Sequence, residues 1–306
     1  MIRQAAFENK KAILKGALHC HTTRSDGAGS PESVVRKHID NGFGFMAITD
    51  HRLYNYENFA KDASIIIVPG MEIDRDIAGA HGVHCFHTVA IGPSRNAGNP
   101  YEQNQSFKTG TVRDQFEFQN TLDQLHCDKQ MTIYCHPQWS STPAREFERL
   151  TGNFAMEIWN SGCAIENEMD VNAAYWDELL MQNIRIWGAA VDDGHAMDHH
   201  CKGWVCVNSD PELSAILDAL KSGAFYSSCG PEIHDFYVDK GTAVVECSPC
   251  QSISFHYGSH PTRITHGDNG APVKCAKFTV PDRFKYIRAS VKDEQGRRAW
   301  TNPIFF

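Results

Sequence analysis

Short apolar runs alternate with helix-like segments over residues 13–230. The clearest predicted helix has Ser30 as its N-cap and Pro31 in its first turn, and it ends at Asn41-Gly42; residues 166–181 and 211–220 are further helical segments. The apolar runs are rich in branched and aromatic residues, as buried parallel strands are, and they are 17–18, 45–48, 65–68, 88–91, 132–134, 154–158 and 184–191. This alternation predicts an α/β layer or barrel.

The pattern changes after Gly230-Pro231. Asp239-Lys240-Gly241 is a turn signal between short strand-like runs, and helical periodicity is absent from this part of the sequence. The runs are 236–238, 243–245, 252–255, 277–280, 286–291 and 299–306. We therefore predict two domains, an α/β unit over residues 1–230 and a small, sandwich-like, all-β domain over residues 231–306.

Composition narrows the class of protein. The 306 residues are 42% hydrophobic and 22% charged, which is typical of a globular chain. The net charge of −8 disfavours a nucleic-acid polymer as partner. No apolar run approaches the roughly 20 residues of a membrane span, and residues 1–15 contain no apolar signal core. We expect a cytoplasmic protein whose 11 cysteines, Cys247 and Cys250 included, are free and mostly buried thiols.

Histidines and carboxylates lie at the ends of the predicted strands. The C-terminal ends of parallel strands meet on one face of a barrel, and imidazoles with carboxylates are the ligand set for Zn, Mn or Fe. A lone His is more often a structural hydrogen-bonding group, but the joint occurrence of so many favours a metal site. The residues are His19, His21, Asp26, His51, Glu72, His87, His136, Asp193 and His195.

The spacing of these residues suits metal binding. Side chains alternate along a strand, so His19 and His21 point to one side and Cys20 to the other. Asp193 and His195 repeat this spacing. A carboxylate such as that of Glu72 can bridge two cations about 3.5–4 Å apart, as in two-metal hydrolysis. The polar segment Asp198-His199-His200 follows the last of these strands, and we expect it to be a solvated loop.

The ordered motifs resemble those of the PHP (polymerase and histidinol phosphatase) family over residues 17–230. This resemblance implies a distorted (β/α)7 barrel with two or three divalent transition-metal ions at its mouth, and hydrolysis of phosphate esters. The segment after residue 230 resembles the accessory domain of bacterial two-domain PHP phosphoesterases. The motifs are His-x-His-Thr-x-x-Ser-Asp-Gly from His19, Thr49-Asp50-His51, Pro69-Gly70-x-Glu72, His87 on a strand, His136-Pro137 and Asp193-x-His195.

Carried over by position, the resemblance implies three sets of ligands. They are His19, His21, Glu72 and Asp193 for one ion, Glu72, His87 and His136 for a second, and Asp26, His51 and His195 for a third. Many members with three ions have His in place of Asp26, so Asp26 is either a ligand suited to Mn or Fe, a base, or a group that orients His195. His81, His84 and His87 recur every three residues, and we choose His87 because 88–92 resembles the family's strand; His84 is the alternative.

These assignments predict a metal-dependent phosphoesterase that hydrolyses a small soluble phosphate ester, of the nucleotide or sugar phosphate class, with a metal-bridging hydroxide as nucleophile. His195 or His51, where not metal-bound, would protonate the leaving oxygen. Two other classes stay open: an amidohydrolase-like enzyme on the same metals, and a non-catalytic, metal-stabilised binding protein. Neither a membrane partner nor a particular oligomeric state is indicated. Cations in or near the site loops could bind phosphate or simply be solvated; they are Arg24, Arg52 and Lys202.

Overall fold

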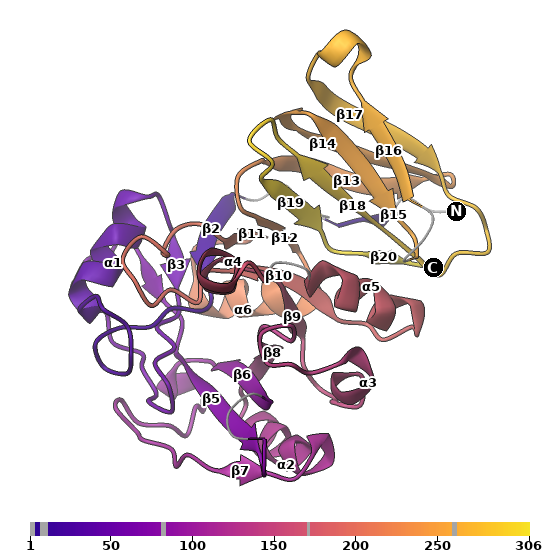
Figure 1. Ribbon diagram of the computed structural model, residues 1–306. Helices are drawn as coiled ribbons and strands as arrows, with labels where there is room; N and C mark the ends of the chain where they lie inside the picture. Colours follow the sequence, from indigo (N-terminus) through magenta and orange to yellow (C-terminus); the bar gives the residue numbers. More distant parts are fainter. Residues whose placement is uncertain (1–3, 7–11, 81–83, 170–171, 259–261) are drawn as a thin grey trace.

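The computed structural model describes residues 4–6, 12–80, 84–169, 172–258 and 262–306 (Figure 1). Its strands form three sheets, of six, ten and four strands. The six-stranded sheet and one part of the ten-stranded sheet build the α/β region. Strands β13 to β20 lie in a mostly-β region, above the α/β region in Figure 1. Among the described residues, no helix is long and apolar enough to cross a bilayer.

The six-stranded sheet has the order β10-β9-β8-β6-β5-β7. Its strands are β10 (Trp187–Val191), β9 (Ala155–Asn160), β8 (Met131–Tyr134), β6 (Cys85–Ile91), β5 (Gly70–Ile77) and β7 (Thr111–Val112). β6 is antiparallel to both of its neighbours, β5 and β8. The expectation of parallel strands is therefore wrong at β6. The connection from β5 is too short for the helical crossover that a parallel pair needs.

The ten-stranded sheet begins in the α/β region and continues into the mostly-β region. Its path is β16 (Thr262–His266), β15 (Ser252–His256), β18 (Tyr286–Lys292), β19 (Arg298–Thr301), β12 (Phe225–Ser228), β11 (Trp204–Asn208), β2 (Ile13–Ala17), β3 (Phe45–Met46) and β4 (Ile66–Ile67), with β20 (Ile304–Phe305) beside β18. Only β2, β3 and β4 are parallel to one another. The pair β12–β19 crosses the predicted domain boundary, so the division at residue 230 stays a prediction.

Single bridges join these two sheets at one end. Cys20 pairs with Gly194, and His51 pairs with Glu72. The ladders of the described strands do not close into one continuous ring, so the barrel stays a prediction. The space between the two sheets is filled by apolar side chains, among them Leu18, Val89, Ile133, Ala189 and Val205, all fully buried.

Six α-helices and two short 3₁₀ helices accompany the sheets in the described part of the chain: α1 (Pro31–Asp40), α2 (Gln115–Cys127), α3 (Ala144–Phe147), α4 (Ser161–Asn167), α5 (Asn172–Met181), α6 (Leu213–Ser222), η1 (Arg95–Ala97) and η2 (Asp268–Gly270). The Ser30 cap of α1 is confirmed, because its side chain accepts a hydrogen bond from the Ser33 amide. The expected helix over 166–181 is wrong in its start, since α4 ends at Asn167 and Glu168 has a left-handed backbone, φ 57°.

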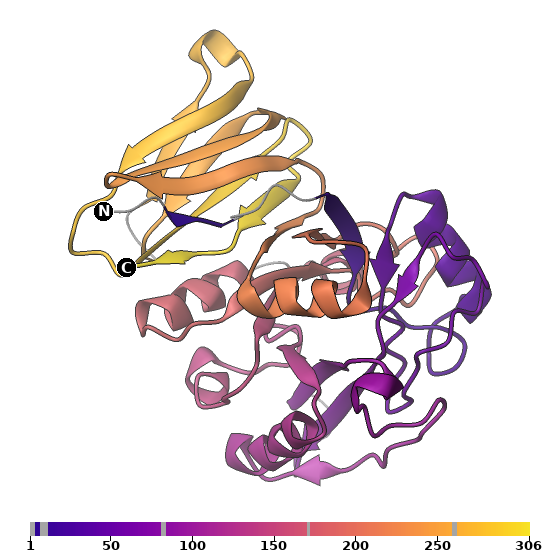
Figure 2. The ribbon, with the colours of Figure 1, turned by 180° about the vertical axis from the view of Figure 1, so that it is seen from behind.

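The mostly-β region encloses a second core. Its four-stranded sheet has the order β1 (Gln4–Ala5), β13 (Ile233–Asp239), β14 (Thr242–Cys250) and β17 (Val273–Thr279). Figure 2 shows β1 beside the orange strands of this region, far from β2. Phe236, Val245, Ile253 and Phe255 belong to this core. The expected thiols are confirmed here, since Cys247 and Cys250 are free and buried.

Candidate metal centre

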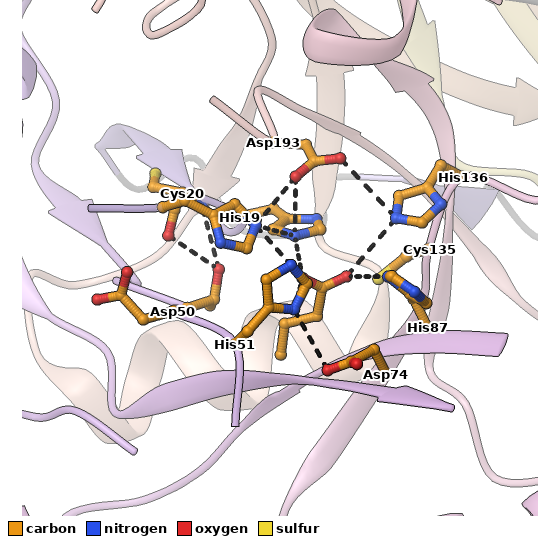
Figure 3. A network of polar contacts seen from close by, with 12 residues as sticks. His19, Cys20, Asp50, His51, Asp74, His87, Cys135, His136 and Asp193 are labelled. Atoms are coloured by element: carbon orange, nitrogen blue, oxygen red, sulfur yellow. Dashed lines mark hydrogen bonds and ion pairs between the residues drawn. The ribbon is translucent and has the colours of Figure 1, made fainter. Parts of the chain in front are cut away.

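The ends of β2, β8 and β10 and the adjoining strands β5 and β6 bring imidazoles and carboxylates together (Figure 3). Backbone hydrogen bonds hold these ends in place: the Asp193 amide donates to the His19 carbonyl at 3.0 Å, and the Arg52 amide donates to the Glu72 carbonyl at 2.7 Å. All nine predicted ligands lie in this cluster. Six of them are buried, while His51 is partly exposed and Asp26 and His195 stand at the rim.

Glu72 lies at the centre of the cluster and is 1% exposed. Its Oε2 atom is 3.3 Å from His19 Nε2, 3.3 Å from His21 Nε2 and 3.1 Å from His51 Nδ1. Its Oε1 atom is 2.9 Å from His87 Nδ1 and 3.5 Å from His136 Nε2. The two carboxylate oxygens thus face two different sets of imidazoles, which is the arrangement that a bridging carboxylate needs.

Asp193 faces three of these imidazoles, and its carboxylate lies above them in the view of Figure 3. Its Oδ1 atom is 3.2 Å from His19 Nε2 and 3.0 Å from His21 Nε2, and its Oδ2 atom is 3.8 Å from His136 Nε2. The side-chain amide of Asn160 donates to Asp193 Oδ2 at 3.0 Å. Asp193 and His136 both have positive φ angles, of 49° and 24°, a strained backbone conformation that is concentrated at functional sites.

Asp26 belongs to a third group at the rim. Its Oδ2 atom is 3.3 Å from His51 Nε2 and 3.5 Å from His195 Nε2, and its Oδ1 atom is 3.4 Å from His21 Nδ1. The ligand atoms of His21, Asp26, His51 and His195 all lie within 4.8 Å of one another. His21 therefore stands between this group and the one around Glu72.

Two carboxylates that lie behind the cluster were not predicted from the sequence to belong to the site. Glu157 Oε1 is 2.6 Å from His19 Nδ1, and Asp74 Oδ1 is 3.4 Å from His51 Nδ1. A signal for each exists in the chain. Glu157 is a charge within an otherwise apolar strand, and Asp74 follows Glu72 by two positions on β5, so both side chains point to one face.

The carboxylates shift the pKa values of the imidazoles upward. Burial alone would lower the pKa of His51, but Glu72, Asp26 and Asp74 outweigh it and raise the pKa to about 11. In the same way, Glu72 raises the pKa of His87 to about 9, and Asp26 with Asp193 raises that of His195 to about 9, against the effect of burial. Burial opposes ionisation of Glu72, but the surrounding imidazoles hold its pKa well below the usual range. A divalent cation would compete with protons for these ring nitrogens.

The donor set fits divalent transition metals. Glu72 Oε2 and His51 Nδ1 are buried without a hydrogen bond in the described part of the chain, and buried polar atoms of that kind call for a partner. His19, His21 and Glu72 have ligand atoms within 4.8 Å of one another, as do Glu72, Cys135 and His136. Imidazole and carboxylate ligands of this kind suit Zn, Mn and Fe.

His84, the alternative to His87 as a metal ligand, does not face Glu72. His84 Nε2 is 2.8 Å from a carboxylate oxygen of Glu146, away from Glu72. Of His84 and His87, the two described members of the His-rich run, it is His87 that faces Glu72. His81 lies outside the described residues.

The predicted phosphate-binding cations are not aimed at the cluster. The Arg24 guanidinium donates to the side chains of Asn55 and Asn104, and Arg52 pairs with Asp74. Lys202 lines a separate cavity, beside Arg288 and Trp300. The cavity over the cluster measures about 240 Å³, and Trp139 and Glu166 form part of its wall.

Comparison with known proteins shows which family the chain belongs to. Over 71 residues the chain is 35% identical to the 5'-3' exoribonuclease of Haemophilus influenzae, a stretch that covers 22% of this chain and 26% of that protein. The fold is similar to that of a two-domain protein from Bacteroides vulgatus containing a predicted PHP-like metal-dependent phosphoesterase (13% identity, 98% of both chains, TM-score 0.49). It is also similar to an amidohydrolase from Chromobacterium violaceum (14% identity, 60% of this chain and 88% of that one, TM-score 0.42). The model of the PHP domain family matches residues 17–172, half of the chain, and the protein therefore belongs to the PHP family.

Proposed function

We propose that this protein is a metal-dependent phosphoesterase that acts on small soluble phosphate esters of the nucleotide or sugar phosphate class. The observation that carries the proposal is the position of Glu72, whose two oxygens face two separate sets of imidazoles. Three ligand groups around one carboxylate exceed what a purely structural site needs, since such a site is closed by four ligands.

Ions in this centre would be held by the three sets already described. His19, His21, Glu72 and Asp193 would hold one, Glu72, His87 and His136 a second, and Asp26, His51 and His195 a third. Divalent ions, when bound, lower the pKa of water and neutralise charge on phosphate oxygens. Because Arg24 and Arg52 are engaged with other side chains, the metal centre is the main source of positive charge for a bound phosphate.

His195 is placed to handle a proton. It is one of the more exposed imidazoles of the cluster, with 32% of its side chain accessible, and its Nε2 atom is 3.5 Å from Asp26 Oδ2. Without bound ions, Asp26 and Asp193 raise the pKa of His195 to about 9 and favour its protonated form. It would then donate that proton to the leaving oxygen, with Asp26 orienting the ring.

The cavity supports a small substrate. Its volume of about 240 Å³ is lined by Trp139, whose ring centroid is 5.0 Å from that of His136. Trp139 is 40% exposed, so it offers a flat apolar surface to the organic part of an ester. Glu166 on the same wall adds negative charge, which disfavours a long polyanion.

A second candidate is removal of nucleotides from the 5' end of short RNA. The observation in its favour is the 35% identity over 71 residues to a 5'-3' exoribonuclease. Both candidates use the same metal centre and differ in the length of the substrate that the cavity admits.

The test is a hydrolysis screen on full-length protein purified without chelator and supplied with Mn, Fe or Zn. The panel contains nucleotides, sugar phosphates, 5'-phosphorylated oligoribonucleotides of increasing length, and simple amides. We expect metal-dependent release of phosphate from small esters. Preference for the oligoribonucleotides supports the second candidate. Turnover of amides alone, or no turnover by folded, metal-loaded protein, contradicts the proposal.

A further inference from the structure

A second group of metal-binding side chains lies behind the strand end that carries His19 and His21. Cys20, between them, points to the opposite side, where it meets His38 of α1 and His200 of the loop after β10. All three side chains are buried, with exposures of 0%, 0% and 1%. We propose that Cys20, His38 and His200, with Asp192 as fourth ligand, form a closed zinc site distinct from the centre around Glu72.

The distances within this group suit one tetrahedral ion. Cys20 Sγ is 3.8 Å from His38 Nε2, and His38 Nε2 is 3.7 Å from Asp192 Oδ2. The ligand atoms of Cys20, His38 and His200 all lie within 4.8 Å of one another. Bond lengths of about 2.0–2.3 Å place two ligand atoms of a tetrahedral zinc ion roughly 3.3–3.8 Å apart. The Cys20–His38 and His38–Asp192 distances already match this spacing, and the His200 ring would have to move toward them.

The tautomer of His38 is set for metal binding. Its Nδ1 atom is 2.8 Å from the backbone carbonyl oxygen of Val34. A carbonyl oxygen only accepts, so Nδ1 carries the hydrogen and Nε2 keeps a lone pair that points toward Cys20. A metal-bound His commonly donates its other ring N–H to a backbone carbonyl in this way.

His200 supplies an independent observation. Neither of its ring nitrogens has a hydrogen-bond partner among the described residues, although the ring is buried. Our expectation of a solvated loop is therefore wrong at His199 and His200, which are 6% and 1% exposed. Burying a polar atom without a partner is costly, and a metal ion at this position would remove that cost.

The charges of the group also balance. A Cys20 thiolate and the Asp192 carboxylate would neutralise one divalent cation, and both imidazoles would be neutral, so the buried site would carry no net charge. Asp192 already accepts backbone hydrogen bonds from Cys201, Lys202 and Gly203, at 2.6 to 2.8 Å. All four ligands are buried, which leaves no open position for a substrate and indicates a structural ion.

Such an ion would cross-link separate parts of the fold. It would tie together α1, the end of β2 and the loop over residues 194–203. The same loop follows Asp193 and carries His195, so an ion at Cys20 would hold the rim of the catalytic cavity from behind.

Cobalt(II) substitution of the full-length protein tests the proposal. Thiolate ligation gives a near-ultraviolet sulfur-to-cobalt charge-transfer absorption, which the imidazole and carboxylate ligands around Glu72 do not give. We expect the wild-type protein to show this band, and Cys20→Ser to lose it together with one equivalent of metal. Two matched controls, Cys135→Ser beside Glu72 and Cys247→Ser in β14, keep the band.

Two further measurements make the result decisive. If Cys20→Ser does not fold, X-ray absorption at the zinc edge of wild-type protein should show a sulfur neighbour at about 2.3 Å, amounting to one sulfur per chain when averaged over all bound zinc ions, and His200→Ala should lose it. Metal-saturated wild-type protein without a sulfur neighbour overturns the proposal, as does a cobalt band that Cys135→Ser removes. Glu72→Gln should keep the band, so failure of the phosphoesterase proposal and failure of this one are separable.

Discussion

Glu157 lies directly behind His19, with its Oε1 atom 2.6 Å from His19 Nδ1 and both side chains fully buried. Its Oε2 atom accepts from the backbone amide of His136 at 2.9 Å and from the Asn160 side chain at 2.8 Å. One carboxylate therefore fixes the ring of His19 and the backbone position of His136, two of the predicted ligands.

Replacement of Glu157 by Gln should weaken metal binding by about 10–100-fold, because partners behind a ligand typically contribute that much. Gln keeps the size of the side chain but loses the charge that holds His19. Competition with a chromogenic chelator measures the affinity. A matched control is Glu146→Gln, which removes the charge that faces His84, away from the cluster. Equal affinity in Glu157→Gln and wild-type protein would show that Glu157 has no role in metal binding.

Glu72→Gln should abolish hydrolysis while the fold is retained. An amide in place of the carboxylate cannot bridge two cations, so both neighbouring ions are disturbed at once. Initial rates on the best ester of the screen measure the loss, and circular dichroism checks the fold. Activity within tenfold of wild type, equivalent to about 1.4 kcal/mol in the barrier, would refute the bridging role.

Metal removal should separate activity from fold. We expect at least two transition-metal ions per chain in protein purified without chelator, because the ligands around Glu72 are too many for one ion. Dialysis against a chelator should remove hydrolysis, and Mn, Fe or Zn should restore it. Elemental analysis measures the content, and fewer than one equivalent under metal-replete conditions would be incompatible with the proposed centre.

A buried ion pair links α5 to the mostly-β region. Arg288 of β18 donates from Nε to Asp177 Oδ1 at 2.9 Å and from Nη2 to Oδ2 at 2.6 Å, and it is 1% exposed. Asp177→Ala should lower the free energy of unfolding by about 3–5 kcal/mol, because Arg288 would be left buried without its partner. Urea denaturation measures the change. The exposed pair Arg113–Glu117 serves as control, where Glu117→Gln should have a much smaller effect because water screens the charges.

The stability of the mostly-β region should depend on pH through His256. Removal from water, together with the nearby charges of Arg288 and Arg298, holds the pKa of His256 well below its ordinary value of 6.5. The unfolded chain binds a proton below pH 6.5 that the folded protein does not, so this contribution to stability is complete above pH 6.5 and is lost as the pH falls.

The comparison with His256→Gln isolates this effect, since Gln can still hydrogen-bond to Ser290, whose Oγ atom is 2.9 Å from His256 Nε2. Unfolding free energies from denaturant titrations between pH 7 and 5 should fall more steeply for wild-type protein. The slope from one group is at most about 1.4 kcal/mol per pH unit. Parallel curves for the two proteins would place the pKa of His256 near its ordinary value.

The members of the cluster could be found in the sequence because they occur in a fixed order, in or beside the predicted strands. The order of Glu72, His136 and Asp193 along the chain is enough to group them. The orientation of Arg24 could not be found in this way, since it depends on the distant partner Asn104, and the cavity that Lys202 lines also includes the distant Trp300. The burial of His200 could not be predicted for the same reason. A polar loop is expected to be solvated, and only the folded structure shows that His38 of α1 packs against His200.

The pairing of β1 with β13 joins Gln4 to Val238 and Ala5 to Tyr237. During synthesis, β1 leaves the ribosome long before the residues of β13 have been added to the chain. The sheet β1-β13-β14-β17 can therefore be completed only after the α/β region has been synthesised, and the closure of so long a loop carries an entropic cost and slows folding. During synthesis the early strand must remain unpaired, and the edge of β13 stays open until β1 returns to it.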